Sequence, residues 1–303
     1  MDRGHGSADH GHRSAGRGHR STGVAVITGT THGIGRVTAC ELAKAGLTLV
    51  MLNRDMKAGN AVRDEIGAVA PGTPIHVLPC DLASLASVRE CARAVRREFD
   101  SIGLLINNAG MVSARHRMSA DGFELTFATN HLGPFLLTQL LLDRMGAGSR
   151  IINVASRAHY RGSLDLERIR APRARYSATG AYAQSKLANV LHTFALARRL
   201  ADRPISTGRP VTANCLHPGI VATNLLPRWL RIVKPLVTRV TFGPERGART
   251  TLHLALSDDV SSISGRYFDE HQAVQPASSL ANEVRLQEAL WAASEHWTCS
   301  AIE

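Results

Sequence analysis

Tyr182 and Lys186 stand four positions apart and have side chains that could exchange protons with a substrate. They lie in a stretch that predicts a helix from about residue 182 to residue 200, so the spacing places both on one helix face, about one turn apart. A free tyrosine has a pKa of about 10 and is a poor base at neutral pH. A neighbouring ammonium group favours the phenolate, and Tyr182 could then give a proton to an oxygen atom or take one from it.

Two further polar residues fall where they could assist. Ser156 directly follows a run that predicts a buried strand, at the strand end where α/β folds place ligands. Its hydroxyl could hold a substrate oxygen against the tyrosine. Asn130 lies within a helical pattern from about Phe123 to Met145, although Asn is a mediocre helix former. It could perturb the helix and bind a water molecule that leads to the lysine, or it could simply face solvent.

The scaffold that must position these residues is predicted by alternating strands and helices. The expected strands are short, apolar and separated by helical patterns; they cover Val24–Thr28, Leu47–Asn53, Ile75–Leu78, Leu104–Asn107, Arg150–Ala155, Val211–Leu216 and Arg266–Phe268. Such alternation gives a parallel sheet with helices on both faces. We therefore expect the α/β class: a three-layer, doubly wound Rossmann fold with a mostly seven-stranded parallel sheet.

The turn after the first strand is rich in glycine and predicts a binding site for a dinucleotide. Glycine lets the backbone turn tightly and approach a pyrophosphate, and the helix that begins there offers unpaired N–H groups to that anion. A glycine-rich turn alone is weak evidence, but this one lies between a buried strand and a helix, as dinucleotide binding requires. The candidate residues are Gly29, Thr31, His32, Gly33, Ile34 and Gly35.

The end of the second strand indicates which dinucleotide is bound. An acidic residue there would bond the 2′-hydroxyl of the adenosine ribose and repel a 2′-phosphate. Asn53 occupies this position and Arg54 follows it. Arginine can clamp a phosphate through two parallel hydrogen bonds, so we expect NADP(H) to be preferred over NAD(H). The alternative is that Arg54 is an ordinary surface charge.

Several short motifs follow one another in a recognisable order. They are TGTTHGIG at 28–35, CDLAS at 80–84, NNAG at 107–110, TNHLGPF at 129–135, INVASRAH at 152–159, YAQSKLAN at 182–189 and HPGIVAT at 217–223. With these motifs the chain resembles the short-chain dehydrogenase/reductase family, in its retinol-dehydrogenase-like branch, over about residues 23–268. The resemblance implies an NADP(H)-dependent oxidoreductase that moves a hydride between the nicotinamide and an alcohol/carbonyl pair.

The resemblance also assigns roles to individual residues. Ser156, Tyr182, Lys186 and Asn130 would be the catalytic residues, and Lys186 would also bond the nicotinamide ribose. Further cofactor contacts would come from Asp81 and Leu82 at the adenine, from Asn108, Ala109 and Gly110 beyond the fourth strand, and from Pro218, Gly219, Val221 and Thr223 around the nicotinamide. For Asp81, Asn108 and the Pro–Gly pair, a plain turn is the rival interpretation.

Two positions depart from the family pattern. Ala155 stands where relatives often have a second Ser, which leaves Ser156 as the clear candidate. His32 stands where NADP-binding members often carry Arg or Lys, so the cofactor prediction rests mainly on Arg54.

The substrate is indicated by a stretch within about residues 224–243, where apolar residues approximate a helical stripe punctuated by Arg and Lys. It could be a lid over an apolar substrate, a segment that rests on a membrane surface, or ordinary core packing. A lid predicts that a lipophilic aldehyde or ketone is reduced. The rival functions are a C=C reductase resembling protochlorophyllide reductase and a non-catalytic NADP-binding regulator.

Composition narrows the remaining classes. The net charge is +11, but no nucleic-acid module accompanies it, so we expect no specific nucleic-acid partner. Five scattered cysteines without a C-x-x-C pair predict neither a metal site nor a disulfide framework. No apolar run reaches the roughly 18 residues that a membrane-spanning helix needs. Because no secretory signal is recognisable either, we expect a cytoplasmic protein.

The expected organisation is a disordered Gly/His/Arg-rich tail at 1–22, a single Rossmann domain at 23–272 and a C-terminal extension with a helix at 273–303. The predicted helices around Phe135–Leu142 and Leu187–Leu200 contain more leucine than one core face requires. A homo-oligomer formed through them is therefore expected, with a soluble monomer as the rival.

Overall fold

The computed structural model describes residues 23–170, 176–202, 208–219 and 243–299. The predicted tail, nearly all of the predicted lid, Val221 and Thr223 lie outside the described residues, so these expectations stay predictions.

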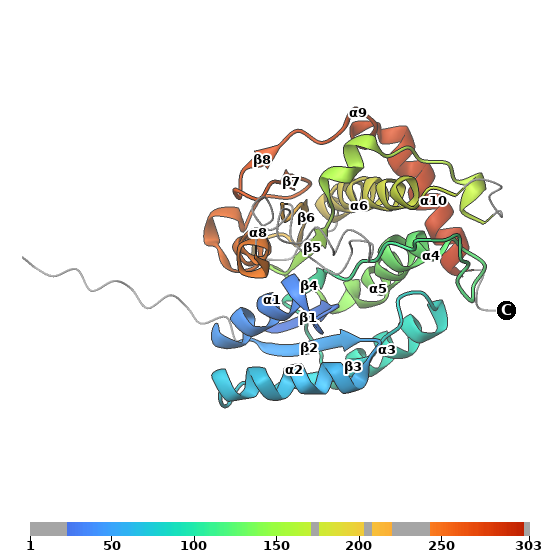
Figure 1. The fold of residues 1–303 in the computed structure, drawn as a ribbon. Coiled ribbons are helices and arrows are strands. Elements are labelled where there is room, and N and C mark those ends of the chain that lie inside the picture. The colour runs from blue at the N-terminus through green and yellow to red at the C-terminus, as the bar shows by residue number, and fades with distance from the viewer. Residues whose placement is uncertain (1–22, 171–175, 203–207, 220–242, 300–303) are drawn as a thin grey trace, which may run out of the picture.

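The centre of the protein is one eight-stranded sheet in the order β3-β2-β1-β4-β5-β6-β7-β8 (Figure 1). Neighbouring strands run parallel from β3 to β7, and only β8 is antiparallel to its neighbour. The strands are β1 Val24–Thr28, β2 Thr48–Asn53, β3 Ile75–Pro79, β4 Leu104–Asn107, β5 Arg150–Val154, β6 Thr212–Leu216, β7 Tyr267–Phe268 and β8 Val274–Gln275. The predicted Rossmann fold is confirmed, and β8 adds a short edge strand that the sequence did not indicate.

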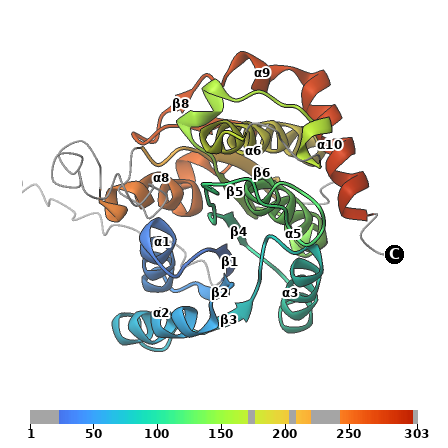
Figure 2. The ribbon, with the colours of Figure 1, turned by 45° about the vertical axis from the view of Figure 1, so that its right-hand side comes forward.

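Helices cover both faces of this sheet (Figures 1 and 2). The helices of one face are α1 Gly33–Lys44, α2 Met56–Val69 and α8 Pro244–Leu256; those of the other are α3 Leu85–Glu98, α5 Gly133–Leu141 and α6 Ala178–Ala201, with α10 Val284–Cys299 outside them. Successive strand residues serve opposite faces: Val26 packs with the second group, whereas Ala25 and Ile27 pack with the first. This double burial explains the continuous apolar runs of the strands.

The segment before β5 differs from the single long helix that its sequence pattern predicts. It consists of α4 Leu125–Phe127, a π-helical turn η1 Ala128–Leu132, α5 and a short 3-10 turn. The π-helical turn contains Asn130, whose buried amide bonds to the backbone of Met111 outside the helix. At the start of α5, Gly133 passes so close to Leu82 that an added Cβ would lie 2.3 Å from the carbonyl oxygen of Leu82. Tertiary contacts therefore override the regular helix here.

The C-terminal helix α10 accounts for part of the leucine-rich surface. It packs on α6 and α5, and its Trp291 ring lies 5.2 Å from the Phe135 ring and 5.7 Å from the His192 ring. Arg199 of α6 stacks over the same indole at 3.9 Å and pairs with Glu288. Some of the apolar area that suggested an oligomer is thus covered within the chain, and the oligomer itself stays a prediction.

Two features of the described residues bear on function. None of the helices in the described ranges is long and apolar enough to cross a membrane. Groups of His, Cys, Asp or Glu that could hold a metal ion do not occur among the same residues.

Candidate active site

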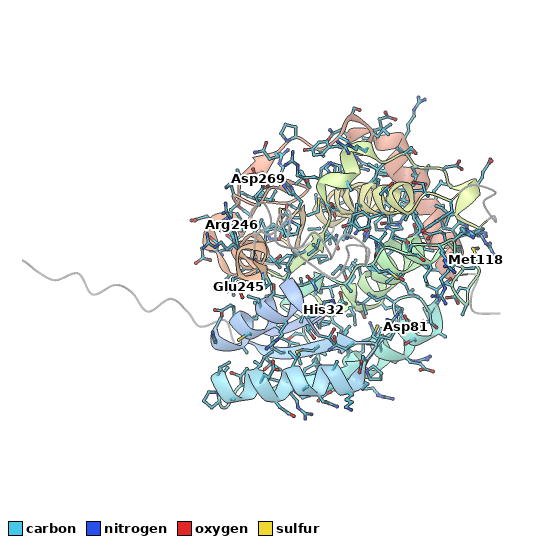
Figure 3. All side chains as sticks on the ribbon, in the orientation of Figure 1. His32, Asp81, Met118, Glu245, Arg246 and Asp269 are labelled. Atoms are coloured by element: carbon cyan, nitrogen blue, oxygen red, sulfur yellow. The ribbon has the colours of Figure 1, made fainter. Side chains whose placement is uncertain are left out.

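A cleft of about 1520 Å³ runs across the carboxyl ends of the parallel strands. Every described cofactor candidate lines it, from the glycine turn at 29–35, through Asn53, Arg54, Asp81, Leu82 and residues 108–110, to Pro218 and Gly219. Ser156, Tyr182 and Lys186 line the same cleft, whereas Asn130 lies behind it. Figure 3 labels His32 and Asp81, which follow β1 and β3 and face this edge of the sheet. The fold therefore brings together residues spread over most of the chain.

The glycine turn is as tight as its sequence predicts. Gly29 has φ +72°, and a Cβ on it would lie 2.8 Å from the Cα of Ala109. A Cβ on Gly35 would lie 2.2 Å from the carbonyl oxygen of Gly29, which leaves no room for any side chain. No side chain caps α1 at His32, so the first N–H groups of the helix are left for an anion.

Buried amides hold this turn in place, and sequence reasoning missed that role. The Asn53 side chain accepts from the Thr30 N–H at 3.1 Å and donates to the Thr30 hydroxyl at 2.8 Å. Asn108 donates from Nδ2 to the carbonyls of Thr28 and Gly29 at 2.9 and 3.1 Å. Both side chains are thus used to build the turn, as the rival interpretation of Asn108 expected. No local motif points to such pairs, because their partners are 23 to 80 residues away.

The adenosine end of the cleft carries one exposed guanidinium group. Arg54 has no carboxylate within ion-pair distance among the described residues, because the neighbouring Asp55 caps α2 by accepting from the Ala58 N–H at 3.0 Å. The Asp81 carboxylate accepts from the Ala83 N–H at 3.0 Å and so shapes the turn after β3. The turn role weighed for Asp81 is therefore present in the structure.

At the other end, Tyr182 and Ser156 are joined by a side-chain hydrogen bond. The Lys186 Nζ lies 5.7 Å from the centre of the Tyr182 ring and donates to the Val154 carbonyl at 2.8 Å. Burial raises the pKa of Tyr182 above 10.0, and the hydrogen bond from Ser156 opposes this only partly. The expectation that a nearby ammonium favours the phenolate is not met in this structure, because desolvation outweighs it. A protonated Tyr182 is suited to donating a proton.

Asn130 is buried rather than solvent-facing, with 1% of its surface exposed. Its Oδ1 accepts from the Met111 N–H at 2.8 Å, and its Nδ2 donates to the Met111 carbonyl at 2.9 Å and to the Ser185 hydroxyl at 3.0 Å. It therefore joins the loop after β4 to α6, which carries Tyr182 and Lys186. A water path from it stays a prediction.

The burial of Lys186 should make stability depend on pH. Desolvation lowers the pKa of this lysine from 10.5 to about 8, so between these values the unfolded chain binds more protons than the folded chain. The free energy of unfolding should therefore rise with pH by about 2 kcal/mol between pH 8 and pH 10, relative to a Lys186→Met variant. Urea titrations at pH 7, 8, 9 and 10 measure this difference. The exposed Lys57→Met variant is the control, and a wild-type advantage that stays constant over this range would contradict the prediction.

A glycine turn for a dinucleotide and a Ser–Tyr–Lys group in one cleft define a class of protein, the nicotinamide-dependent oxidoreductases of the Rossmann fold. The sequence pattern of the family described as short chain dehydrogenase matches residues 23–231. Human (Homo sapiens) retinol dehydrogenase 13 is 38% identical over 280 residues, which cover 89% of this chain and 82% of that protein. Polyprenol dehydrogenase of Mus musculus is 40% identical over 283 residues, with coverage of 89% and 82%.

A solved structure agrees with these relatives. An uncharacterised protein from Mycobacterium Paratuberculosis has a TM-score of 0.74 and 36% identity, covering 91% of this chain and 93% of its own. The chain therefore belongs to the short chain dehydrogenase family and is retinol-dehydrogenase-like. It is an oxidoreductase of a family that binds a nicotinamide cofactor and acts on small molecules.

Proposed function

We propose that this protein uses NADPH to reduce a lipophilic aldehyde or ketone to the alcohol. The observation that carries the proposal is the hydrogen-bonded Tyr182–Ser156 pair beside Lys186, in the same cleft as the glycine turn. Retinol and polyprenol, which the names of the relatives mention, are apolar alcohols, and this supports an apolar substrate.

The residues present fit a dinucleotide. The Gly29–Gly35 contact leaves bare backbone where a pyrophosphate must approach, and the uncapped start of α1 offers N–H groups to it. When bound, the dinucleotide supplies the hydride that adds to the carbonyl carbon. Gly110 leaves Lys186 access to this region, since a Cβ there would lie 3.3 Å from the Lys186 Nζ.

The chain's own residues complete the reaction by supplying the proton. In the proposed mechanism the Ser156 hydroxyl holds the carbonyl oxygen, and the Tyr182 hydroxyl gives its proton to that oxygen as negative charge develops there. The phenolate that remains is stabilised by the ammonium of Lys186. Because burial favours a protonated Tyr182, the resting enzyme is ready for reduction rather than for oxidation.

The preference for NADP(H) is proposed from Arg54. Charge-assisted bonds to a 2′-phosphate should be lost in Arg54→Ala, which lowers kcat/KM with NADPH by about 10- to 100-fold and leaves kcat/KM with NADH unchanged. Steady-state kinetics with both cofactors measures the ratio. Arg63→Ala, on an exposed part of α2, is the control. If the ratio of the two efficiencies is the same in Arg54→Ala as in the wild type, Arg54 does not read the phosphate.

The substrate class can be tested by following NADPH loss with apolar aldehydes, small polar ketones and conjugated enones. Apolar aldehydes should show the highest kcat/KM, by about 10-fold or more over small polar ketones, because each buried methylene contributes about 0.8 kcal/mol. Better turnover of the polar ketones would contradict the lipophilic substrate. Products with a saturated C=C bond would favour the C=C reductase alternative instead.

Some expectations stay predictions at this level. They are the cytoplasmic location, the homo-oligomer, contact with a membrane surface and the absence of a specific nucleic-acid partner. Retention on immobilised DNA at physiological salt would contradict the last of these.

A further inference from the structure

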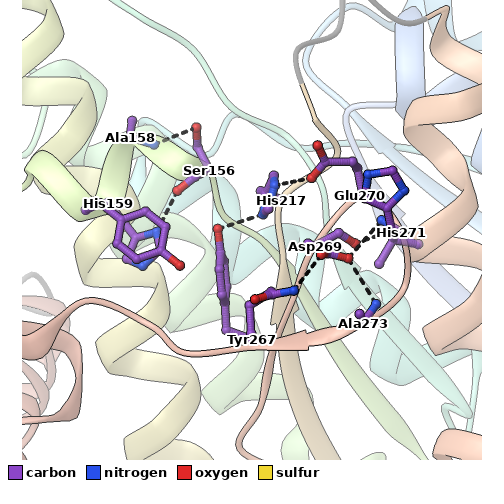
Figure 4. A network of polar contacts seen from close by, with 12 residues as sticks. Ser156, Ala158, His159, His217, Tyr267, Asp269, Glu270, His271 and Ala273 are labelled. Carbon is purple, nitrogen blue, oxygen red and sulfur yellow. Dashed lines mark hydrogen bonds and ion pairs between the residues drawn. The ribbon is translucent and has the colours of Figure 1, made fainter.

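The chain between β7 and α9 touches both sides of the cleft, although no motif drew attention to it. We call residues 267–278 the strap. Figure 4 shows the strap residues Tyr267, Asp269 and Glu270 beside His159 and His217, which lie next to the proposed Ser156 and Pro218–Gly219 positions. Both histidines are buried, with 0% and 5% of their surface exposed.

The first arm of the strap reaches the backbone of Ser156. The His159 Nε2 lies 3.2 Å from the Ser278 N–H, which can only donate, so Nε2 is the acceptor. The ring proton is therefore on Nδ1, which donates to the Ser156 carbonyl at 2.8 Å. The neighbouring Tyr160 hydroxyl donates to the Pro276 carbonyl at 2.6 Å. The turn that carries Ser156 is thus fastened to the strap at two points.

The second arm reaches the residue before Pro218–Gly219. The His217 Nε2 lies 2.5 Å from a Glu270 carboxylate oxygen, and its Nδ1 lies 2.7 Å from the Tyr267 hydroxyl. Burial lowers the pKa of His217, so the ring is neutral at neutral pH. A carboxylate only accepts, so the ring proton is on Nε2, and the Tyr267 hydroxyl donates to Nδ1. Both ring nitrogens are therefore held by strap residues.

The strap is itself a fixed element. The Asp269 carboxylate accepts from the N–H groups of His271 and Ala273 at 2.8 and 3.0 Å and from the Gln275 side chain at 2.8 Å. These bonds form the turn between β7 and β8 and place Glu270 opposite His217. The Tyr267 ring packs edge-on against His159 at 4.6 Å and stacks on His217 at 5.4 Å. One aromatic ring therefore connects the two arms.

We propose that the strap is a positioning device with two separable outputs: Glu270 and Tyr267, through His217, set the nicotinamide end of the cofactor site, and His159 sets Ser156. The proposal rests on the proposed function for the identity of these two sites. A purely structural strap would instead lower the amount of folded protein and change both outputs together.

The nicotinamide output can be tested by binding alone, without turnover. Glu270→Gln and Tyr267→Phe should each raise the Kd of NADP⁺ by about 5- to 10-fold, since one buried hydrogen bond is weakened or lost. The Kd of 2′-phospho-ADP-ribose, which lacks the nicotinamide, should stay as in the wild type. The exposed Glu283→Gln variant is the control. If both ligands weaken equally, or neither weakens, the proposal is overturned.

This measurement separates the strap from the proposed cofactor preference. If the wild type binds NAD⁺ rather than NADP⁺, the proposed preference fails, and the pair NAD⁺ and ADP-ribose then tests the strap in the same way. Isothermal titration of variants whose circular dichroism and Tm match the wild type excludes an effect of partial unfolding.

The serine output can be tested by a conservative rescue. His159→Asn keeps an N–H donor close to the position of Nδ1, whereas His159→Leu removes it. We expect kcat to fall by about 10-fold or more in His159→Leu and by no more than about 3-fold in His159→Asn, with KM for NADPH unchanged in both. Equal loss in the two variants, or a change confined to KM for the cofactor, would sink this arm of the proposal.

Discussion

A Tyr182→Phe variant should fold normally and lose about 10²- to 10⁴-fold in kcat, the range that positioned proton transfer contributes to enzymes. The change removes one oxygen atom, which is the atom bonded to Ser156 and the one proposed to give its proton to the substrate. The ring and its packing stay. KM for NADPH should change by less than about 3-fold, because the cofactor contacts come mainly from the glycine turn.

The control for this variant is Tyr176→Phe, which removes a hydroxyl outside the cleft that bonds to Glu124 at 3.0 Å. It should keep kcat close to the wild-type value. Single-turnover reduction with NADPH would show whether the loss lies in the chemical step. Equal turnover by Tyr182→Phe and wild type would remove the proton-transfer mechanism, and absence of turnover in both would favour the non-catalytic regulator.

The fold was predictable because its signals are local. A strand buried on both faces, such as residues 24–28 or 49–52, is a continuous apolar run, and the glycine turn follows the first of them directly. The two-residue β8, with both residues exposed, has no such signal. The π-helical turn at Asn130 was hinted at only by a polar residue in a helical pattern, since its cause is a contact with Met111.

The candidate site was predictable in its membership but not in its support. Tyr182 and Lys186 share a helix, so their spacing fixes their relation. The contacts that hold the site, such as His217 with Glu270 or Asn53 with Thr30, join residues far apart in sequence. The direction of the Tyr182 pKa shift also depended on burial, which residue spacing does not report.

Gly35→Ala should abolish measurable dinucleotide binding, with an increase in Kd of at least about 100-fold. The new methyl group would lie 2.2 Å from the carbonyl oxygen of Gly29 and 2.4 Å from Nδ2 of Asn108. Neither atom can move alone, because Asn108 donates to that same carbonyl and to that of Thr28. The whole turn must shift, and overpacking of this kind costs about 1–3 kcal/mol of stability. Fluorescence titration with NADPH measures the loss.

The matched control is Gly67→Ala, in which the added Cβ meets nothing within 4 Å on the exposed side of α2. Here the same change should raise stability by about 0.5–1 kcal/mol, because alanine loses less backbone entropy than glycine in a helix, and Kd for NADPH should not change. The two variants differ only in what the methyl group meets. If Gly35→Ala bound NADPH as tightly as Gly67→Ala, the pyrophosphate would not lie against this turn, and the cofactor would have to enter the cleft in another orientation.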